Sequence, residues 1–225
     1  MIRAVVFDFD GVIANSEPLH FRAYRDVLVD KGIALTEASY YEHYLGYDDI
    51  GAFKAIAADT GTAFTDADMA SLVARKAVRL EELEKSGSVL FPGARDAIVR
   101  MAEAFPIAVA SGALKAEILR VLEHEQLRSY FQFVVSAEDT PASKPDPAPY
   151  LLAAEKLRST LADLQANECV AIEDSKWGLV SARAAGMRTV GITHTYPASA
   201  LVHVSDTVIT HLDQFTPVLV HALAR

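Results

Sequence analysis

The sequence predicts an α/β fold in which a Rossmann-like parallel sheet core carries an inserted all-helical cap domain. Short, almost continuously apolar segments alternate with amphipathic helical patterns over most of the chain. Strands that are apolar on both faces are typical of a parallel sheet covered by helices on either side. The stretch 17–89 breaks this alternation, because it shows helical periodicity and no convincing strand. We therefore expect a helical insertion after the first strand.

The first predicted strand covers residues 3–9, where a β-branched apolar run ends at Asp10 and Gly11 and so indicates a sharp turn. Five later segments have the same character and are predicted to be strands: Ile107–Ser111, Phe133–Ser136, Cys169–Glu173, Thr189–Ile192 and Thr207–Ile209. Helical patterns separate them, namely Ala94–Ala104, Lys115–Glu123, Pro149–Leu157 and Trp177–Ala185. This order of strands and helices favours parallel pairing.

Four helices are predicted within the inserted stretch: Pro18–Lys31, Ala38–Tyr44, Asp49–Thr60 and Asp66–Lys85. Thr65 followed by Asp68 resembles a capping box at the start of the last helix. Gly61 and the pair Gly87-Ser88 supply breaks between elements. We therefore expect a discontinuous α/β core domain, residues 1–15 and 90–225, and a helical cap domain, residues 16–89.

Composition and charge disfavour several classes of function. The 225 residues carry a formal net charge of −9, which makes nucleic acid and anionic membranes poor partners. No apolar run approaches the roughly 18 residues that span a membrane, and no signal peptide is expected. Cys169 is the single cysteine, so an intrachain disulfide is impossible. The predicted location is the cytoplasm, and the predicted assembly is a monomer or a weak homo-oligomer.

Polar side chains follow the predicted strands at the points where each strand ends. In open α/β sheets these carboxyl ends meet at one edge, where ligands bind. The residues concerned are Asp8, Asp10, Gly11, Ser111, Gly112, Lys144, Glu173, Asp174 and Ser175. Carboxylates, a hydroxyl, a lysine and backbone amides near glycine suit a hard, oxygen-seeking cation together with a phosphoryl group.

Each of these features also has a simpler interpretation. Asp8 and Asp10 could form a turn or edge-strand pair, although four preceding apolar residues make an exposed strand improbable. Glu173-Asp174-Ser175 could cap the following helix. Ser111-Gly112 could be a plain turn, and Lys144 a surface lysine. Two acidic pairs at two strand ends favour a Mg²⁺ site instead, because the cation would relieve their mutual repulsion.

Taken in chain order, these segments resemble the four motifs of the haloacid dehalogenase superfamily. The matching segments are Asp8–Val12, Ala110–Gly112, Lys144–Pro147 and Glu173–Ser175, with Gly178 and Ala182–Gly186 beyond the last. The helical insert stands where subfamily I of this superfamily places its cap. The closest branch resembles the β-phosphoglucomutase-like phosphatases, whose cap positions His20 and Lys76 match.

The resemblance implies a role for each matched residue. Asp8 would attack phosphorus, and Asp10 would act as general acid and then general base. Asp8, the backbone carbonyl of Asp10 and Asp174 would hold Mg²⁺, with Glu173 nearby. The phosphoryl oxygens would be bound by Ser111, Gly112 and Lys144, and the substrate selected by cap residues His20, Gly46, Tyr47 and Lys76. The implied activity is Mg²⁺-dependent hydrolysis of a small phosphorylated metabolite, with sugar phosphates among the candidate substrates.

Particular residues bear on the competing functions. A sugar-phosphate mutase of this type has a cationic residue after Gly46 to bind the second phosphate, but here Asp48 and Asp49 follow. Lys76 is left as a positive charge that could face the site. A dehalogenase lacks the aspartate found at Asp10. In a response-regulator receiver the acidic pair precedes the phosphorylated aspartate, whereas here Asp8 comes first and Glu173-Asp174 comes late. A dinucleotide site needs a Gly-x-Gly-x-x-Gly turn after the first strand, and this sequence does not have one there. A non-catalytic phospho-ligand binding protein of the same fold stays open.

Overall fold

The computed structural model describes residues 1–45 and 47–224. The chain forms two compact units. One comprises Met1–Asn15 and Val89–Arg225, and the other comprises Ser16–Ser88. Among the described residues, no helix combines the length and the apolar character needed to cross a membrane.

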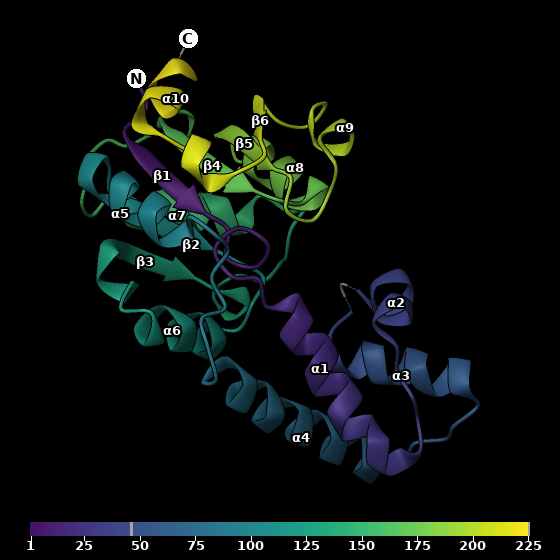
Figure 1. The fold of residues 1–225 in the computed structure, drawn as a ribbon. Helices are drawn as coiled ribbons and strands as arrows, with labels where there is room; N and C mark the ends of the chain where they lie inside the picture. The colour runs from purple at the N-terminus through teal and green to yellow at the C-terminus, as the bar shows by residue number, and fades with distance from the viewer. Residues whose placement is uncertain (46, 225) are drawn as a thin grey trace. The chain divides into compact units, whose positions relative to one another are not determined.

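The first unit is built on a six-stranded, wholly parallel sheet, which confirms the predicted fold class (Figure 1). Its strands are β1 (Ala4–Phe7), β2 (Ile107–Ala110), β3 (Phe131–Val135), β4 (Cys169–Glu173), β5 (Arg188–Ile192) and β6 (Thr207–Ile209). Their order across the sheet is β3-β2-β1-β4-β5-β6. Phe7 is in register with Val109 of β2 and Ile172 of β4. The residues that follow β1, β2 and β4 therefore emerge side by side.

Helices cover the sheet on both faces, which explains why its central strands are apolar throughout. The α-helices of this unit are α5 (Ala94–Ala104), α6 (Lys115–His124), α7 (Ala148–Leu157), α8 (Lys176–Ala184), α9 (Ala198–Leu201) and α10 (Pro217–Ala222). Short helical turns are η3 (Arg128–Tyr130), η4 (Ala137–Asp139), η5 (Ala166–Glu168) and η6 (Leu212–Gln214). Val6 packs in a core cluster with Tyr150 of α7. Phe7 points to the opposite face, where its ring meets Phe215 edge to face.

Four predicted strands differ from the structure at one or both ends. The first strand ends at Phe7 rather than Phe9, and the second ends at Ala110 rather than Ser111. Phe9 is buried, but its carbonyl accepts hydrogen bonds from the loop amides of Ile13 and Ala14 instead of pairing across the sheet. The hydrophobic pattern of the sequence indicates which residues are buried, whereas the length of a strand depends on where its backbone stops hydrogen-bonding to the neighbouring strands. The third strand spans Phe131–Val135 rather than Phe133–Ser136, and the fifth begins at Arg188 rather than Thr189.

The second unit is entirely helical over its described residues. It contains α1 (Glu17–Leu28), η1 (Val29–Lys31), α2 (Glu37–Ser39), the π-helical turn η2 (Tyr40–Tyr44), α3 (Asp49–Thr60) and α4 (Asp66–Glu84). Helices α1 and α4 pack along each other, and aromatic and aliphatic side chains of α1, η2 and α3 form its core. The predicted capping box of α4 is confirmed, because Thr65 and Asp68 bond each other's backbone amides at 3.1 Å.

Candidate active site

The loop after β1 begins at Asp8, whose buried carboxyl group lies at the carboxyl end of the strand. Gly11 turns this loop with φ of +78°, a left-handed conformation that favours glycine. A Cβ atom at Gly11 would stand 2.0 Å from Oδ2 of Asp174. Glycine is therefore required here twice over, since it allows both the turn and the close approach of the β1 loop to the end of β4.

The end of β4 is organised by the helix that follows it. Ser175 is the N-cap of α8, and its hydroxyl accepts a hydrogen bond from the amide of Gly178 at 3.0 Å. The capping interpretation of this motif therefore applies to Ser175. A Cβ atom at Gly178 would lie 1.8 Å from Oε1 of Glu173. Glycine in the first turn of α8 thus leaves room for the carboxylate of Glu173.

Three carboxyl groups gather at this edge of the sheet. One oxygen from each of Asp8, Glu173 and Asp174 lies within 4.8 Å of the others, and all three residues are buried. Burial and the charge of Glu173 raise the pKa of Asp8 well above its usual range, and the same two causes raise the pKa of Asp174 to about 7. An all-oxygen, mutually repelling donor set of this kind fits a hard divalent cation such as Mg²⁺.

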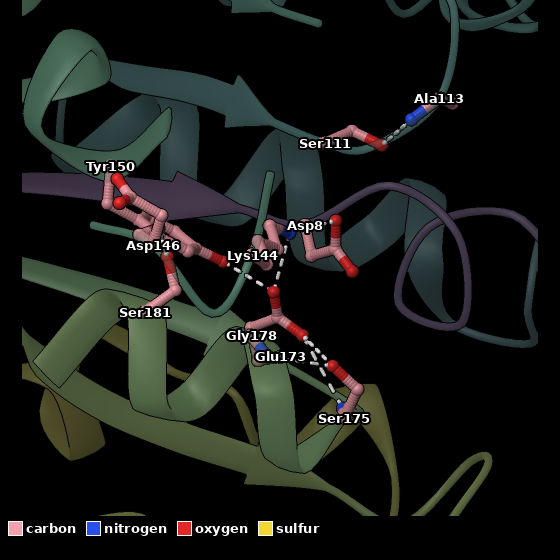
Figure 2. Close-up of polar contacts among 10 residues, drawn as sticks. All are labelled: Asp8, Ser111, Ala113, Lys144, Asp146, Tyr150, Glu173, Ser175, Gly178 and Ser181. Carbon is pink, nitrogen blue, oxygen red and sulfur yellow. Dashed lines mark hydrogen bonds and ion pairs between the residues drawn. The ribbon is translucent and has the colours of Figure 1, made fainter. Parts of the chain in front are cut away.

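Lys144 supplies a cation inside this acidic cluster (Figure 2). Its Nζ donates to Oδ1 of Asp8 at 2.7 Å and to Oε1 of Glu173 at 2.6 Å. Burial opposes the charged ammonium group, but the two carboxylates outweigh it and raise the pKa of Lys144. The side chain is 12% exposed, which rules out the surface-lysine interpretation. Its loop is held by Ser181, whose hydroxyl donates to the carbonyl of Asp146 at 2.5 Å.

Both oxygens of Glu173 are occupied by protein donors. Besides Lys144, Oε1 accepts a hydrogen bond from the hydroxyl of Tyr150 at 2.7 Å. Oε2 accepts from the hydroxyl of Ser175 at 3.1 Å. Tyr150 lies on the otherwise mostly apolar α7, where sequence reasoning assigned it no role. Its hydroxyl was the available signal, since a buried tyrosine usually has a hydrogen-bond partner.

The remaining predicted core residues lie on two loops. Ser111 is buried directly after β2, and its hydroxyl accepts a hydrogen bond from the amide of Ala113 at 3.0 Å (Figure 2). Gly112 has open space where a Cβ would stand. Asp10 lies in the β1 loop and forms an isolated bridge with Ala14. Its carboxylate is not part of the described cluster around Asp8.

In the helical unit, the structure brings together two predicted cap residues and one acid. Nζ of Lys76 lies 2.7 Å from Oδ1 of Asp49 and 2.9 Å from Nδ1 of His20. Burial, followed by the charge of Lys76, lowers the pKa of His20 to about 3, so His20 is neutral and accepts this bond. Tyr24 also donates to Oδ1 of Asp49 at 2.7 Å. The sequence left Lys76 as a positive charge that could face the site, and in the structure Asp49 neutralises that charge.

Other described residues in and around the stretch 44–48 lie apart from this group. Tyr47 is 54% exposed, and Gly46 lies outside the described residues. Asp48 is the N-cap of α3 and accepts from the amide of Gly51 at 2.7 Å. Tyr44 packs in the core of the helical unit and donates to Asp59 at 2.8 Å. Among the described residues, Asp49 is paired with a lysine, whereas Asp48 caps a helix.

Comparison with known proteins identifies similar chains along nearly the whole length. The sequence model of the family described as haloacid dehalogenase-like hydrolase matches residues 5–192. Hexitol phosphatase B of Escherichia coli (strain K12) is 31% identical over 191 residues, covering 84% of this chain and 82% of the relative. Fructose-1-phosphate phosphatase YqaB of Escherichia coli (strain K12) is 30% identical over 197 residues, with 84% and 95% covered. The crystal structure of a β-phosphoglucomutase-type protein from Thermotoga maritima superposes with a TM-score of 0.81 at 26% identity, covering 97% of this chain and 98% of that one.

Proposed function

Because this chain belongs to the haloacid dehalogenase-like hydrolase family, we propose that it is a Mg²⁺-dependent phosphatase with Asp8 as the nucleophile. The observation that carries the proposal is the buried carboxyl of Asp8, which lies 2.7 Å from the ammonium of Lys144 at the end of β1. A nucleophile that must approach a phosphate dianion needs such a positive neighbour. The relatives named for hexitol and fructose 1-phosphate hydrolysis support a sugar or polyol phosphate as substrate.

The carboxylates of Asp8 and Asp174 and the backbone carbonyl of Asp10 would hold the cation. Glu173 would lie next to the cation and orient the groups around it, since its oxygens accept hydrogen bonds from Lys144, Tyr150 and Ser175. When bound, Mg²⁺ neutralises charge on the phosphoryl group and on the carboxylates around it. With the cation present, Asp8 and Asp174 ionise more readily than their raised pKa values indicate.

In the first step, a carboxylate oxygen of Asp8 attacks phosphorus, and the bond from phosphorus to the ester oxygen breaks. Asp10 donates a proton to that departing oxygen, which leaves as an alcohol. Lys144, the hydroxyl of Ser111 and the amide of Gly112 bind the phosphoryl oxygens and stabilise the charge that spreads over them. The products of this step are the alcohol and an aspartyl phosphate.

In the second step, Asp10 takes a proton from a water molecule that attacks the same phosphorus. The bond from phosphorus to Asp8 breaks, and inorganic phosphate is released. Splitting the reaction in this way replaces one difficult displacement by two easier ones. Proton transfer by a positioned carboxyl group contributes about 10²–10⁴-fold to such reactions.

Net hydrolysis is favoured over phosphate transfer between two positions of a sugar. A mutase has to bind a second phosphate group, and this requires a positively charged residue in the helical unit. Here Lys76 is neutralised by Asp49 at 2.7 Å, and Asp48 adds a further negative charge nearby in sequence. Two dianionic groups are therefore poorly accommodated, whereas a hydroxyl-bearing, singly phosphorylated compound is not repelled.

The direct test is phosphate release from hexitol phosphates, fructose 1-phosphate and an aryl phosphate, with Mg²⁺ and with excess chelator. Asp8→Asn removes the nucleophilic charge at constant size, and Asp96→Asn is the matched control on the exposed side of α5. We expect turnover by the wild type and by D96N in Mg²⁺ only, and none by D8N. Turnover by D8N, or undiminished turnover in chelator, would refute the proposal. Binding of phosphate esters without any turnover by the wild type would favour a non-catalytic binding protein.

A further inference from the structure

The loop that follows β5 also reaches the candidate active site. The amide of Thr193 donates to the carbonyl of Ile209 in β6 at 3.1 Å and so anchors the start of this loop. In the next residue, Nδ1 of His194 lies 2.8 Å from the carbonyl oxygen of Gly11. A carbonyl oxygen only accepts hydrogen bonds, so Nδ1 of His194 carries the proton. The loop thereby holds the β1 loop at the glycine that turns it.

The imidazole ring of His194 is fixed from a second direction. It stacks on the ring of Phe91, with ring centroids 3.9 Å apart and an interplanar angle of 15°. Phe91 is itself tied to the β1 loop, since its amide donates to the carbonyl of Ile13 at 2.9 Å. Burial lowers the pKa of His194, which keeps the ring neutral with a single proton to donate. Stacking therefore orients the ring, and the hydrogen bond acts on Gly11.

The neighbouring residue acts on Asp174, which approaches the same glycine. Thr195 hydrogen-bonds the carboxylate of Asp174 through its side chain. Asp174 in turn lies so close to Gly11 that a Cβ atom there would overlap its oxygen atoms. Two consecutive residues of one loop thus hold the β1 loop and the end of β4, which are the two segments that carry the proposed metal ligands.

We propose that His194 is a positioning residue that fixes the Gly11 peptide and, through it, the direction of the Asp10 carbonyl toward the metal site. This inference rests on the proposed function, because the Asp10 carbonyl acts as a ligand only there. The carbonyl of Asp10 and the carbonyl of Gly11 lie on either side of one α-carbon. Rotation at Gly11, which has no side chain to resist it, would turn the Asp10 carbonyl away from the cation.

Two substitutions separate the hydrogen bond from the stacking. His194→Phe keeps an aromatic ring over Phe91 and removes the donor, whereas His194→Asn keeps an N–H donor near the position of Nδ1 and removes the ring. His124→Phe is the control, since the His124 side chain is 49% exposed at the end of α6. Mg²⁺ affinity is measured by calorimetry without substrate, and melting temperature is measured in chelator. Steady-state rates on an aryl phosphate are then recorded at several Mg²⁺ concentrations.

We expect H194F to weaken Mg²⁺ binding about three- to tenfold, the equivalent of one ordinary hydrogen bond. H194N should retain most of the affinity, and H124F all of it, while KM at saturating Mg²⁺ stays within about twofold. Wild-type Mg²⁺ affinity in H194F would overturn the inference. So would equal weakening in H194F and H194N that follows their melting temperatures. If the wild type binds Mg²⁺ but hydrolyses no ester, the proposed function fails while these affinities still test His194; a wild type that binds no Mg²⁺ overturns both.

Discussion

The hydroxyl of Tyr150 donates to Oε1 of Glu173 at 2.7 Å, and this is the oxygen that also accepts from Lys144. Tyr150 is fully buried in the core between α7 and the sheet, and the ammonium of Lys144 lies 5.1 Å from the centre of its ring. The tyrosine therefore contacts the lysine both through Glu173 and through its ring face. Tyr150 packs like part of the hydrophobic core, yet it sets the direction of the Lys144 ammonium group that faces Asp8.

Tyr150→Phe keeps the packed ring and removes only the hydroxyl. A hydrogen bond to a charged group is worth about 1.5–3 kcal/mol, so we expect kcat for an aryl phosphate to fall about tenfold. KM should change little, because the lysine remains present. Steady-state kinetics checks this, with Tyr130→Phe as a control that removes a hydroxyl from η3. A wild-type kcat in Y150F would show that Glu173 is held well enough by Ser175 and Lys144 alone.

The raised pKa of Asp174, about 7 against about 3.9 in an unfolded chain, predicts a pH-dependent stability of the metal-free protein. Burial and Glu173 cause the shift, so the folded state binds a proton that the unfolded state releases. The contribution is fully present below about pH 4 and is lost as the pH rises toward 7. In chelator, the free energy of unfolding should therefore fall between these values.

Asp174→Asn removes the titrating group and should flatten this decline, as measured by urea unfolding at several pH values. Hydrogen bonds from Ser136 outweigh partial burial and lower the pKa of Asp139 to about 2, so the contribution of that residue changes only below pH 4. Burial and Glu173 raise the pKa of Asp8 as well, and burial raises that of Glu17, so both residues contribute to the decline. The difference between D174N and the wild type is therefore the informative quantity. Parallel pH profiles for the two proteins would contradict the assignment.

Gly178→Ala tests the space that α8 leaves for Glu173. Alanine improves helix propensity by about 1 kcal/mol over glycine. Its Cβ would, however, stand 1.8 Å from Oε1 of Glu173 and displace a fully buried carboxylate, which costs about 3–5 kcal/mol when its partners are left unpaired. The second effect is larger, so we expect a less stable protein and a kcat about 10²-fold lower.

Gly87→Ala is the matched control for this substitution, because nothing lies within 4 Å of a Cβ at that position. It should leave kcat and the unfolding midpoint nearly unchanged. Urea unfolding and aryl phosphate kinetics on the two variants give the comparison. Equal behaviour of G178A and G87A would mean that Glu173 has another position available without loss of function.

The pair formed by Asp49 and Lys76 should govern discrimination against a second phosphate. Asp49→Asn leaves Lys76 uncompensated and should raise kcat/KM for fructose 1,6-bisphosphate relative to fructose 1-phosphate. Asp49 is 31% exposed, and partly screened pairs contribute up to about 1 kcal/mol, so the ratio should rise about three- to fivefold. Asp48→Asn makes the same charge change one residue earlier and preserves a helix cap. An equal rise in both variants would assign the effect to net charge alone.

Sequence reasoning located the acids and the lysine of the candidate site because parallel strands bring their carboxyl ends to one edge. Asp8 and Glu173 stand at the ends of apolar runs, and Lys144 lies in the loop between β3 and α7, so their order along the chain was enough to place them together. Tyr150 was missed because its ring satisfies the apolar pattern of α7. Periodicity reports which face of a helix is buried, and it carries no information on what a buried hydroxyl contacts.

The interactions of Asp49 and His194 lay beyond sequence reasoning for a different reason. Asp49 and Lys76 are 27 residues apart on two helices, and their pairing depends on how those helices cross. His194 and Gly11 are 183 residues apart and meet only because β5 lies one strand beyond β4. Each contact is decided by side-chain direction in the packed molecule, to which local propensity contributes little.

The position of β1 in the sheet has a consequence for how the molecule fluctuates. Its amides and carbonyls are paired with β2 on one side and β4 on the other, while β3 and β6 form the two edges. Edge strands can fray without exposing β1, so the backbone amides that precede Asp8 should exchange with solvent deuterium only through global unfolding. Asp8, the proposed nucleophile, would thereby be attached to the slowest-exchanging strand, and its alignment would persist through local openings elsewhere in the protein.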